Sequence, residues 1–189
     1  LQGRDIALCA MDPSRMSATP AGVATPSSPE IQLLVPSSHE LWAATGRIFR
    51  DYAASLPIDL SFQGFEEELS RLDEHYAQPQ GGVVLALVDG QVAGCGAFRP
   101  LPDVDHPNAC EMKRLYVRPA FRRLGLGRLV AERLIGLATQ AGYSNMLLDT
   151  LDDMEVARSL YGSLGFQEVA PYYFNPLPGA HYLCVRLGP

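Results

Sequence analysis

The chain has 189 residues, of which 47% are hydrophobic and 19% are charged. This composition suits one compact domain with a sizeable core. The 15 basic and 21 acidic residues leave a net charge of −6, which argues against nucleic acid as a partner and favours cationic or neutral ligands. No apolar run approaches the roughly 20 residues that a membrane span needs, so we expect a soluble protein with no membrane partner.

The cysteines and histidines show no spacing typical of a metal site. The cysteines are Cys9, Cys95, Cys110 and Cys184, and the histidines are His39, His75, His106 and His181. We therefore expect no bound metal. Widely separated thiols also suit a reduced cytosolic protein, which predicts a cytoplasmic location.

Residues 1–30 are rich in Ala, Pro, Ser and Thr and have no apolar periodicity. They are typical of a weakly ordered tail or extension, so the folded domain is predicted to span residues 31–189. The first residue is Leu1 and not Met, which fits processing, a tag remnant or an arbitrary start. A targeting peptide is disfavoured because the segment has no clear apolar core.

The predicted domain begins with a short strand, residues 31–35, and two helices. Ser37 and Glu40 form a capping box for the first helix, which Pro57 ends. The second helix, over residues 65–76, has one apolar face and one acidic face. The acidic face carries Glu66, Glu67, Glu68, Asp73 and Glu74. Such a face is usually solvated, although it also attracts cationic ligands.

The centre of the sequence predicts strands and a long helix. Residues 83–88 and 91–98 flank Asp89-Gly90, a dipeptide that suits a tight hairpin because both positions tolerate positive φ. A further strand covers residues 109–117. Apolar residues at three- and four-residue spacing then predict a helix over residues 125–141, closed by Gly142. A buried strand follows over residues 145–150.

The C-terminal part adds one helix and two strands. Asp152 and Glu155 form a capping pair for a helix through Leu164, with Gly165 after its end. Strands are predicted over residues 166–169 and 181–187, around a loop rich in Pro and Tyr. The mixture of strands and helices, without repeats, predicts a single domain of the α/β (α+β) class.

The segment from Arg118 to Arg128 joins a strand to an amphipathic helix and contains Gly125 and Gly127. Glycines let a ligand approach the backbone closely, and the first turn of a helix offers amide groups without intrahelical partners. These features predict a site for an anion such as a pyrophosphate, although two glycines also suit a structural turn. The spacing matches neither a P-loop nor a dinucleotide-binding fingerprint, because no Lys-Ser or Lys-Thr follows and position 130 is Val130.

Two motifs resemble those of the GNAT acetyltransferases. The first is Arg122-x-x-Gly125-x-Gly127, which follows the strand over residues 111–117. The second runs from Ala157 to Phe166 and is similar to the family pattern A-x-x-L-Y-x-x-x-G-F. The motifs occur in the family's order and at a family-like separation. The resemblance covers residues 31–187 and is sharpest over residues 109–170.

The resemblance implies the GNAT acyl-CoA N-acyltransferase fold, a mixed sheet of six to seven strands flanked by about four helices. The sheet would splay between the strands ending at Val117 and Thr150, and acetyl-CoA, the family's cosubstrate, would enter that gap. The residues implied in coenzyme binding are Leu115, Tyr116, Val117, Arg122, Arg123, Leu124, Gly125, Leu126, Gly127 and Arg128. One departure is Met154, which stands where many relatives have a coenzyme-contacting asparagine.

Acetylation of an amine needs a group that accepts the proton of the amine, whose pKa is near ~10.4 for lysine, and a group that protonates the leaving thiolate. Glu111 resembles the glutamate of the histone-acetylating branch by its spacing from Arg122, which implies the base. A structural pairing of Glu111 with Lys113 or Arg114 is the alternative. Tyr161 of the second motif is implied as the acid, although its apolar stripe also suits a core residue.

Tyr172, Tyr173, Phe174 and Asn175 lie between the last two predicted strands. The resemblance places them over the acceptor side, where the aromatic rings would pack on an acceptor, on a second subunit of a homodimer, or against the sheet. We therefore expect an N-acetyltransferase that moves acetyl from acetyl-CoA to a primary amine of a small-molecule or peptide acceptor. The alternatives are a non-catalytic acyl-CoA-binding sensor and a toxin that acetylates protein or tRNA, and the acidic charge disfavours the tRNA version.

Overall fold

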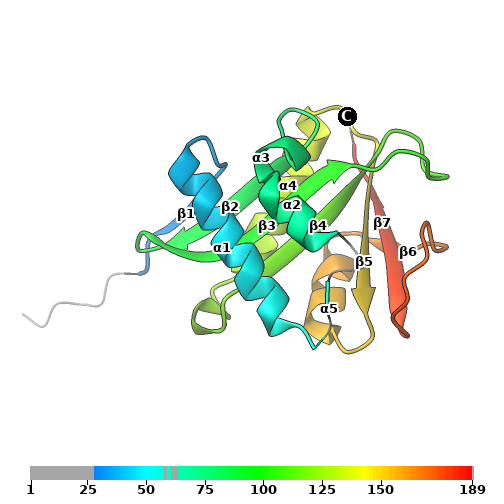
Figure 1. Ribbon diagram of the computed structural model, residues 1–189. Coiled ribbons are helices and arrows are strands. Elements are labelled where there is room, and N and C mark those ends of the chain that lie inside the picture. The colour runs from blue at the N-terminus through cyan, green and yellow to red at the C-terminus, as the bar shows by residue number, and fades with distance from the viewer. Residues whose placement is uncertain (1–27, 58, 61–63, 189) are drawn as a thin grey trace, which may run out of the picture.

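Seven strands form one mixed sheet within residues 28–57, 59–60 and 64–188, the part of the chain that the computed structural model describes (Figure 1). The strand order is β1-β2-β3-β4-β5-β7-β6. The strands are β1 (Ile31–Leu34), β2 (Gly82–Val88), β3 (Gln91–Pro100), β4 (Ala109–Val117), β5 (Asn145–Leu151), β6 (Gln167–Glu168) and β7 (Ala180–Arg186). The helices are α1 (His39–Ser55), α2 (Phe65–Ser70), α3 (Leu72–His75), α4 (Leu126–Gln140), α5 (Glu155–Ser163) and the short 3-10 helix η2 (Pro119–Phe121). The predicted tail lies outside the described residues, apart from residues 28–30.

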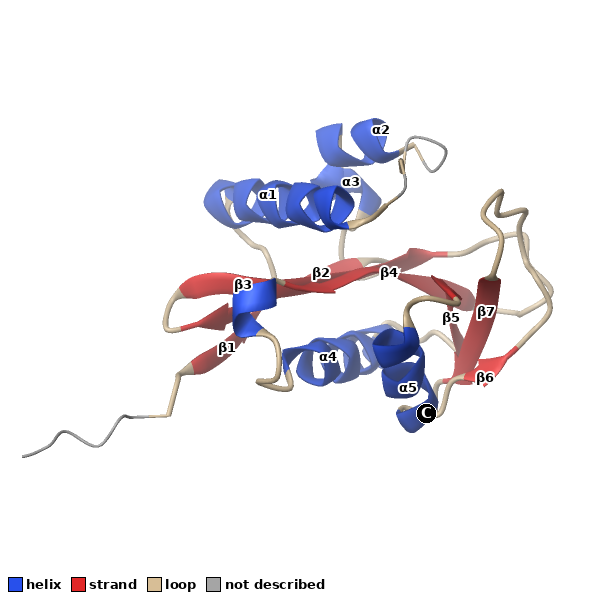
Figure 2. Ribbon diagram, turned by 90° about the horizontal axis from the view of Figure 1, so that it is seen from below, coloured by secondary structure: helices blue, strands red, loops and turns tan. Residues whose placement is uncertain are grey.

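The sheet has a hydrophobic core on each face. Figure 2 shows α1, α2 and α3 over one face and α4 and α5 over the other. Alternate residues of β2 enter opposite cores, as the two-residue repeat of a strand requires. Val84 packs in the α4 core, and Leu85 packs in the α1 core with Phe49. Both faces are therefore buried along β2, which explains its nearly continuous apolar sequence.

Helix α4 lies close to the sheet at Gly96 of β3. A Cβ atom at this position would lie 2.7 Å from Leu134 Cδ1 and 2.8 Å from Val130 Cγ1. Glycine therefore allows α4 to approach the sheet closely. The segment from Arg118 to Arg128, here called the glycine loop, leads into the N-terminus of this helix and contains Gly125 and Gly127. Across the described residues, no helix combines the length and the apolar character that crossing a membrane requires.

Strands β4 and β5 run parallel and separate part of the way along their length. They pair only over residues 109–111 and 145–147. β5 remains paired with β7 along its length, and β4 remains paired with β3. Within the described residues, no strand pairs with the β5-facing edge of β4 from Met112 to Val117. The splay expected between these strands is therefore confirmed.

One extra residue in β4 forms a β-bulge beside this gap. Two steps along β3, from Cys95 to Ala97, correspond to three steps along β4, from Tyr116 to Lys113. Arg114 lies within the bulge and has a positive φ of 60°. The bulge shifts the alternation of the β4 side chains, so that Arg114 lies on the α1 side of the sheet together with Tyr116.

Two predicted helix caps are wrong. The N-cap of α1 is Ser38 and not Ser37, since the Ser38 Oγ accepts a hydrogen bond from the Leu41 N–H (3.3 Å). Helix α5 begins after Met154 without a side-chain cap. Asp152, the predicted cap, bonds instead to His181 across the sheet (2.6 Å). In both helices the N-cap is therefore a neighbour of the predicted residue, Ser38 for α1 and Met154 for α5.

The predicted second helix is interrupted at Arg71, where φ is −138° and ψ is 41°. This break divides it into α2 and α3, so the described residues contain five α-helices where about four were expected. The predicted acidic face is also wrong for Glu68, which is 2% exposed. Glu68 accepts hydrogen bonds from Arg114 (2.6 and 2.9 Å) and from the Tyr76 hydroxyl (2.7 Å). The ion pair with Arg114 of β4 buries Glu68, although the neighbouring acidic residues suggested a solvent-exposed helix face.

Candidate active site

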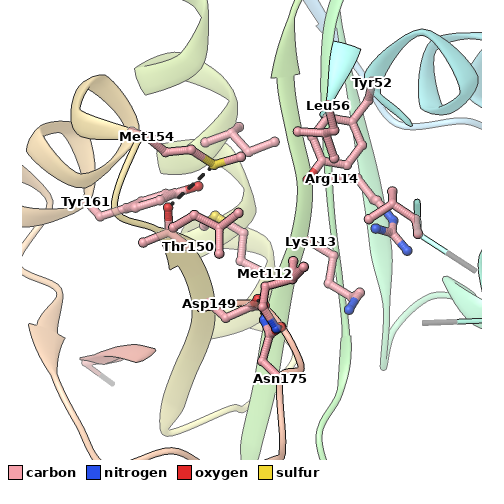
Figure 3. A pocket seen from close by; sticks show the side chains of 15 residues that line it. Tyr52, Leu56, Met112, Lys113, Arg114, Asp149, Thr150, Met154, Tyr161 and Asn175 are labelled. Carbon is pink, nitrogen blue, oxygen red and sulfur yellow. Dashed lines mark hydrogen bonds between the residues drawn. The ribbon is translucent and has the colours of Figure 1, made fainter. Parts of the chain in front are cut away.

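A cavity, here called the splay cavity, opens where β4 and β5 diverge (Figure 3). Its walls come from α1, β4, β5, α5 and the loop before β7. The lining residues are Tyr52, Leu56, Leu60, Met112, Lys113, Arg114, Leu115, Asp149, Thr150, Leu151, Met154, Ala157, Tyr161, Asn175 and Leu177. Segments that are distant in the sequence therefore meet at the point where the sheet separates.

Tyr161 extends from α5 into the splay cavity, and its ring packs on Phe166 with centroids 5.6 Å apart (Figure 3). Burial raises the pKa of the Tyr161 hydroxyl above its ordinary value, and Tyr52 and Asp149 raise it further. The phenol is therefore protonated at neutral pH and acts as a hydrogen-bond donor. Within the described residues, no atom forms a hydrogen bond with this hydroxyl, so its proton is available to a ligand.

Asp149 lines the same cavity and was not predicted as a site residue. Its carboxylate accepts a hydrogen bond from Asn175 Nδ2 (3.1 Å). Burial raises the pKa of the Asp149 carboxyl above its ordinary value, although Lys113 and a hydrogen bond with Tyr173 oppose this shift. The sequence did contain a signal for Asp149, because it is the one carboxylate within the apolar strand β5. Aspartates are rarely buried without a partner or a function.

Glu111 lies at the end of the paired part of β4, and its side chain is 5% exposed. Its carboxylate is 3.3 Å from Lys113 Nζ and 3.6 Å from Arg99 Nη2, and it accepts a hydrogen bond from the Tyr172 hydroxyl (3.2 Å). It lines a neighbouring cavity, here called the loop cavity, and not the splay cavity. The two predicted catalytic residues, Glu111 and Tyr161, are therefore not in one cavity.

The glycine loop leads into the N-terminus of α4. Gly125 is the N-cap of this helix with φ at 73° and no side-chain cap. A Cβ atom there would meet nothing within 4 Å, so the backbone conformation and not crowding requires glycine. Among the described residues, no group accepts a hydrogen bond from the backbone N–H groups of residues 124–128. Such donors at the positive end of a helix are able to hold an anion.

The arginines of this loop are partly engaged with neighbouring groups. Arg122 Nε donates to the Val117 carbonyl oxygen (3.2 Å). Arg128 donates to Ser163 Oγ (2.5 Å) and to Glu132 (3.2 Å). Through these contacts the loop is bonded to the end of β4 and to α5, which both contribute residues to the lining of the splay cavity.

The four predicted acceptor residues lie in two environments. Asn175 lines the splay cavity, whereas Tyr172, Tyr173 and Phe174 line the loop cavity. Tyr172 and Tyr173 pack on Tyr182 of β7, with ring centroids 5.3 and 5.5 Å apart. Phe174 is 86% exposed. The aromatic run therefore divides between packing on the sheet and contact with solvent.

The cysteines of the described residues, Cys95, Cys110 and Cys184, are buried free thiols. Burial raises the pKa of Cys110 to about 12, which keeps it protonated and unreactive at neutral pH. The described part of the chain contains no group of three or more His, Cys, Asp or Glu residues that could hold a metal ion.

A sheet that splays beside a helix N-terminus rich in free amide donors is the architecture of the GNAT acetyltransferases. Residues 46–166 match the model of the Acetyltransferase (GNAT) family. The chain belongs to this family, and it is an acetyltransferase.

Individual relatives agree with this assignment. The chain is 40% identical over 141 residues to an uncharacterized N-acetyltransferase of Schizosaccharomyces pombe, covering 74% of this chain and 85% of that protein. It is 31% identical over 113 residues to N-acetylaspartate synthetase of Danio rerio, covering 59% of this chain and 39% of that protein. A putative acetyltransferase of Salmonella typhimurium, solved with its cofactor acetyl-CoA, shares the fold with a TM-score of 0.63 and 19% identity over 84% of this chain and 94% of that one.

Proposed function

We propose that this acetyltransferase moves an acetyl group from acetyl-CoA directly to a primary amine of a small-molecule or peptide acceptor. One observation carries the proposal. The open edge of β4 connects the free amide donors at the start of α4 with the Tyr161 hydroxyl and the Asp149 carboxylate in the splay cavity. The acetyl-CoA complex of the Salmonella relative supports the choice of coenzyme.

The two halves of the coenzyme would be held by different parts of this chain. The amide groups of residues 124–128 would bind the pyrophosphate at the positive end of α4. The backbone of Leu115, Tyr116 and Val117 would pair with the pantetheine arm as an added strand would, because among the described residues no strand pairs with this edge of β4. Arg122, Arg123 and Arg128 would add positive charge near the phosphates.

In the proposed reaction, the amine nitrogen attacks the thioester carbonyl, a C–N bond forms and the C–S bond breaks. Asp149 accepts the proton that the amine loses, and Tyr161 donates a proton to the departing thiolate. A backbone N–H on the open edge of β4 would stabilise the oxyanion. Solvent then carries the proton from Asp149 to the Tyr161 phenolate, so both residues end the cycle as they began it.

We favour Asp149 over Glu111 as the base because Asp149 and Tyr161 line the same cavity. The Glu111 carboxylate already contacts Lys113, Arg99 and the Tyr172 hydroxyl. The comparison of Asp149→Asn with Glu111→Gln separates the two candidates. We expect Asp149→Asn to lower kcat by about a hundredfold and Glu111→Gln to lower it much less. The opposite order would return the role to Glu111.

The test of the whole proposal measures thiol release from acetyl-CoA across a panel of amines, with mass spectrometry of the products. We expect acetyl-CoA to bind with measurable heat and at least one amine to gain 42 Da, about the mass of an added acetyl group replacing hydrogen. Binding of acetyl-CoA without any acetylated product would favour the non-catalytic sensor. Absence of heat on titration with acetyl-CoA or CoA would reject the coenzyme site itself.

A further inference from the structure

The splay cavity has an acceptor half, defined here by Tyr52, Leu56, Leu60, Asp149, Asn175 and Leu177. Leu56, Leu60 and Leu177 supply hydrocarbon surface to the cavity. The side chains of Asp149 and Asn175 lie next to each other (Figure 3). A ligand in this half therefore meets one carboxylate set among apolar side chains.

The charged side chains that line the cavity differ in their ion pairs. Lys113 and Arg114 each contact a carboxylate, whereas Asp149 contacts no cation within 4 Å among the described residues. Lys113 Nζ lies 3.3 Å from the Glu111 carboxylate, and Arg114 Nη2 lies 2.6 Å from the Glu68 carboxylate. Each of these cations contacts a buried carboxylate, although the charge of Lys113 also acts on Asp149 and opposes the rise in its pKa. Among the described residues, no Lys, Arg or His nitrogen lies within 4 Å of the Asp149 carboxylate. Its hydrogen-bond partners are neutral groups, the Asn175 amide (3.1 Å) and the Tyr173 hydroxyl.

Arg99 is a third cation next to this site. It contacts Glu111 at 3.6 Å from the loop cavity, which Asp103 also lines. Its side chain is 29% exposed, so water screens its charge. The acceptor half of the splay cavity therefore retains about one negative charge, at Asp149.

We infer that the acceptor is a small primary amine with an apolar body and no carboxylate close to the amine. This inference rests on the proposed function and specifies its acceptor. The protonated amine would be attracted to the Asp149 carboxylate on entry and would lose one proton to solvent before the neutral amine attacks, and the three leucines would cover the hydrocarbon part. An α-carboxylate would be held beside Asp149 in a partly buried site, where like charges repel strongly. The N-acetylaspartate synthetases match only part of this chain, and an acidic amino acid does not suit this charge pattern.

Three acceptors with one hydrocarbon skeleton test the charge argument with the full-length protein and saturating acetyl-CoA. Isoamylamine has no carboxylate, leucine adds one, and leucinamide adds a neutral group of similar volume. We expect kcat/KM for leucine and for aspartate to be about a hundredfold below that for isoamylamine, with leucinamide much closer to isoamylamine. Equal or better use of leucine or aspartate would overturn the inference and leave the proposed acetyl transfer intact. Leucinamide as poor as leucine would also overturn it, because size and not charge would then decide.

Two variants test the residues directly. Asp149→Asn should lower kcat/KM for every amine and reduce the preference for isoamylamine over leucine to about tenfold or less. Leu177→Asn should raise the KM for isoamylamine severalfold without changing the KM for acetyl-CoA, while Val156→Asn, at a residue 87% exposed outside the cavity, should change neither. An unchanged preference in Asp149→Asn would reject Asp149 as the source of selectivity. If no amine were acetylated although acetyl-CoA bound, the proposed function would fail as well.

Discussion

Replacement of Glu68 by glutamine tests the buried ion pair that joins α2 to the β4 bulge. The side chains of Glu68 and Arg114 are each 2% exposed, and two hydrogen bonds of 2.6 and 2.9 Å connect them. The Arg114 guanidinium also lies 5.9 Å from the Tyr52 ring centroid and 5.2 Å from that of Phe65. Loss of the carboxylate removes the negative charge that Glu68 places against the buried cation, whereas a glutamine retains the volume of the side chain.

The expected loss of stability follows from this burial. Removal of one partner of a buried ion pair typically costs about 3–5 kcal/mol, and the glutamine oxygen keeps part of the hydrogen bonding, so we expect about 3 kcal/mol for Glu68→Gln. For a domain of this size each kcal/mol corresponds to roughly 2–4 °C, which predicts a fall in Tm of roughly 6–12 °C. Thermal unfolding followed by circular dichroism measures this change.

The matched control is Glu67→Gln on the same helix. The side chain of Glu67 is 72% exposed and lies 3.9 Å from Arg71, so its loss should change stability by no more than about 0.5 kcal/mol. Addition of Arg114→Met to Glu68→Gln should restore part of the lost stability, because the buried cation is then removed as well. A Tm of Glu68→Gln within about 2 °C of the wild type would refute the reasoning.

The same pair has a defined pH dependence. Burial raises the pKa of Glu68, but the hydrogen bond and the charge of Arg114 outweigh this effect and leave the pKa below its ordinary value. A carboxyl with a lowered folded-state pKa stabilises the protein above its unfolded pKa, near ~4.3 for Glu. The stability difference between the wild type and Glu68→Gln should therefore shrink as the pH falls below about 4.3.

Three further changes test other parts of the structure. Tyr161→Phe should lower kcat by about a hundredfold with little change in acetyl-CoA binding, and full turnover would exclude the acid role. Gly125→Ala should cost about 1–2 kcal/mol because of its positive φ, whereas Gly136→Ala, in the middle of α4, should stabilise by about 0.5–1 kcal/mol; equal effects in chemical denaturation would contradict this. Hydrogen bonds with Asp152 and Glu168 raise the pKa of His181, so its stabilisation is complete below about 6.5 and declines at higher pH. Tm measured from pH 6 to 9 should therefore fall more in the wild type than in His181→Gln, and parallel curves would reject the contribution.

The strands and the start of α4 were predictable because local sequence determines them. β4 was predicted with its observed bounds, Ala109–Val117, and Arg118-Pro119 marks its end. The start of α4 was predicted within one residue from Gly125, whose conformational freedom suits the turn before a helix. The two motifs also indicated the family before any contact was known. Each of these signals lies within a few consecutive residues.

The acceptor side was less predictable, because its residues meet only through long-range contacts. Asp149 and Asn175 come from β5 and from the loop before β7, and Tyr52 comes from α1. The pattern of Glu66, Glu67 and Glu68 suggested one solvated face, and only the approach of Arg114 shows that Glu68 is buried. No short window of sequence contains that information.

The sequence by itself determined the family, the order of strands and helices, and the glycine turn at the start of α4, because periodicity, turn residues and motifs act over short separations. The tertiary structure decided which carboxylates are matched by cations and which one faces the splay cavity. Electrostatic interactions in a buried site depend on distances of a few ångström between segments far apart in the chain. For this reason Glu111 and Glu68 are engaged in ion pairs, while Asp149 alone of the three lines the cavity next to Tyr161.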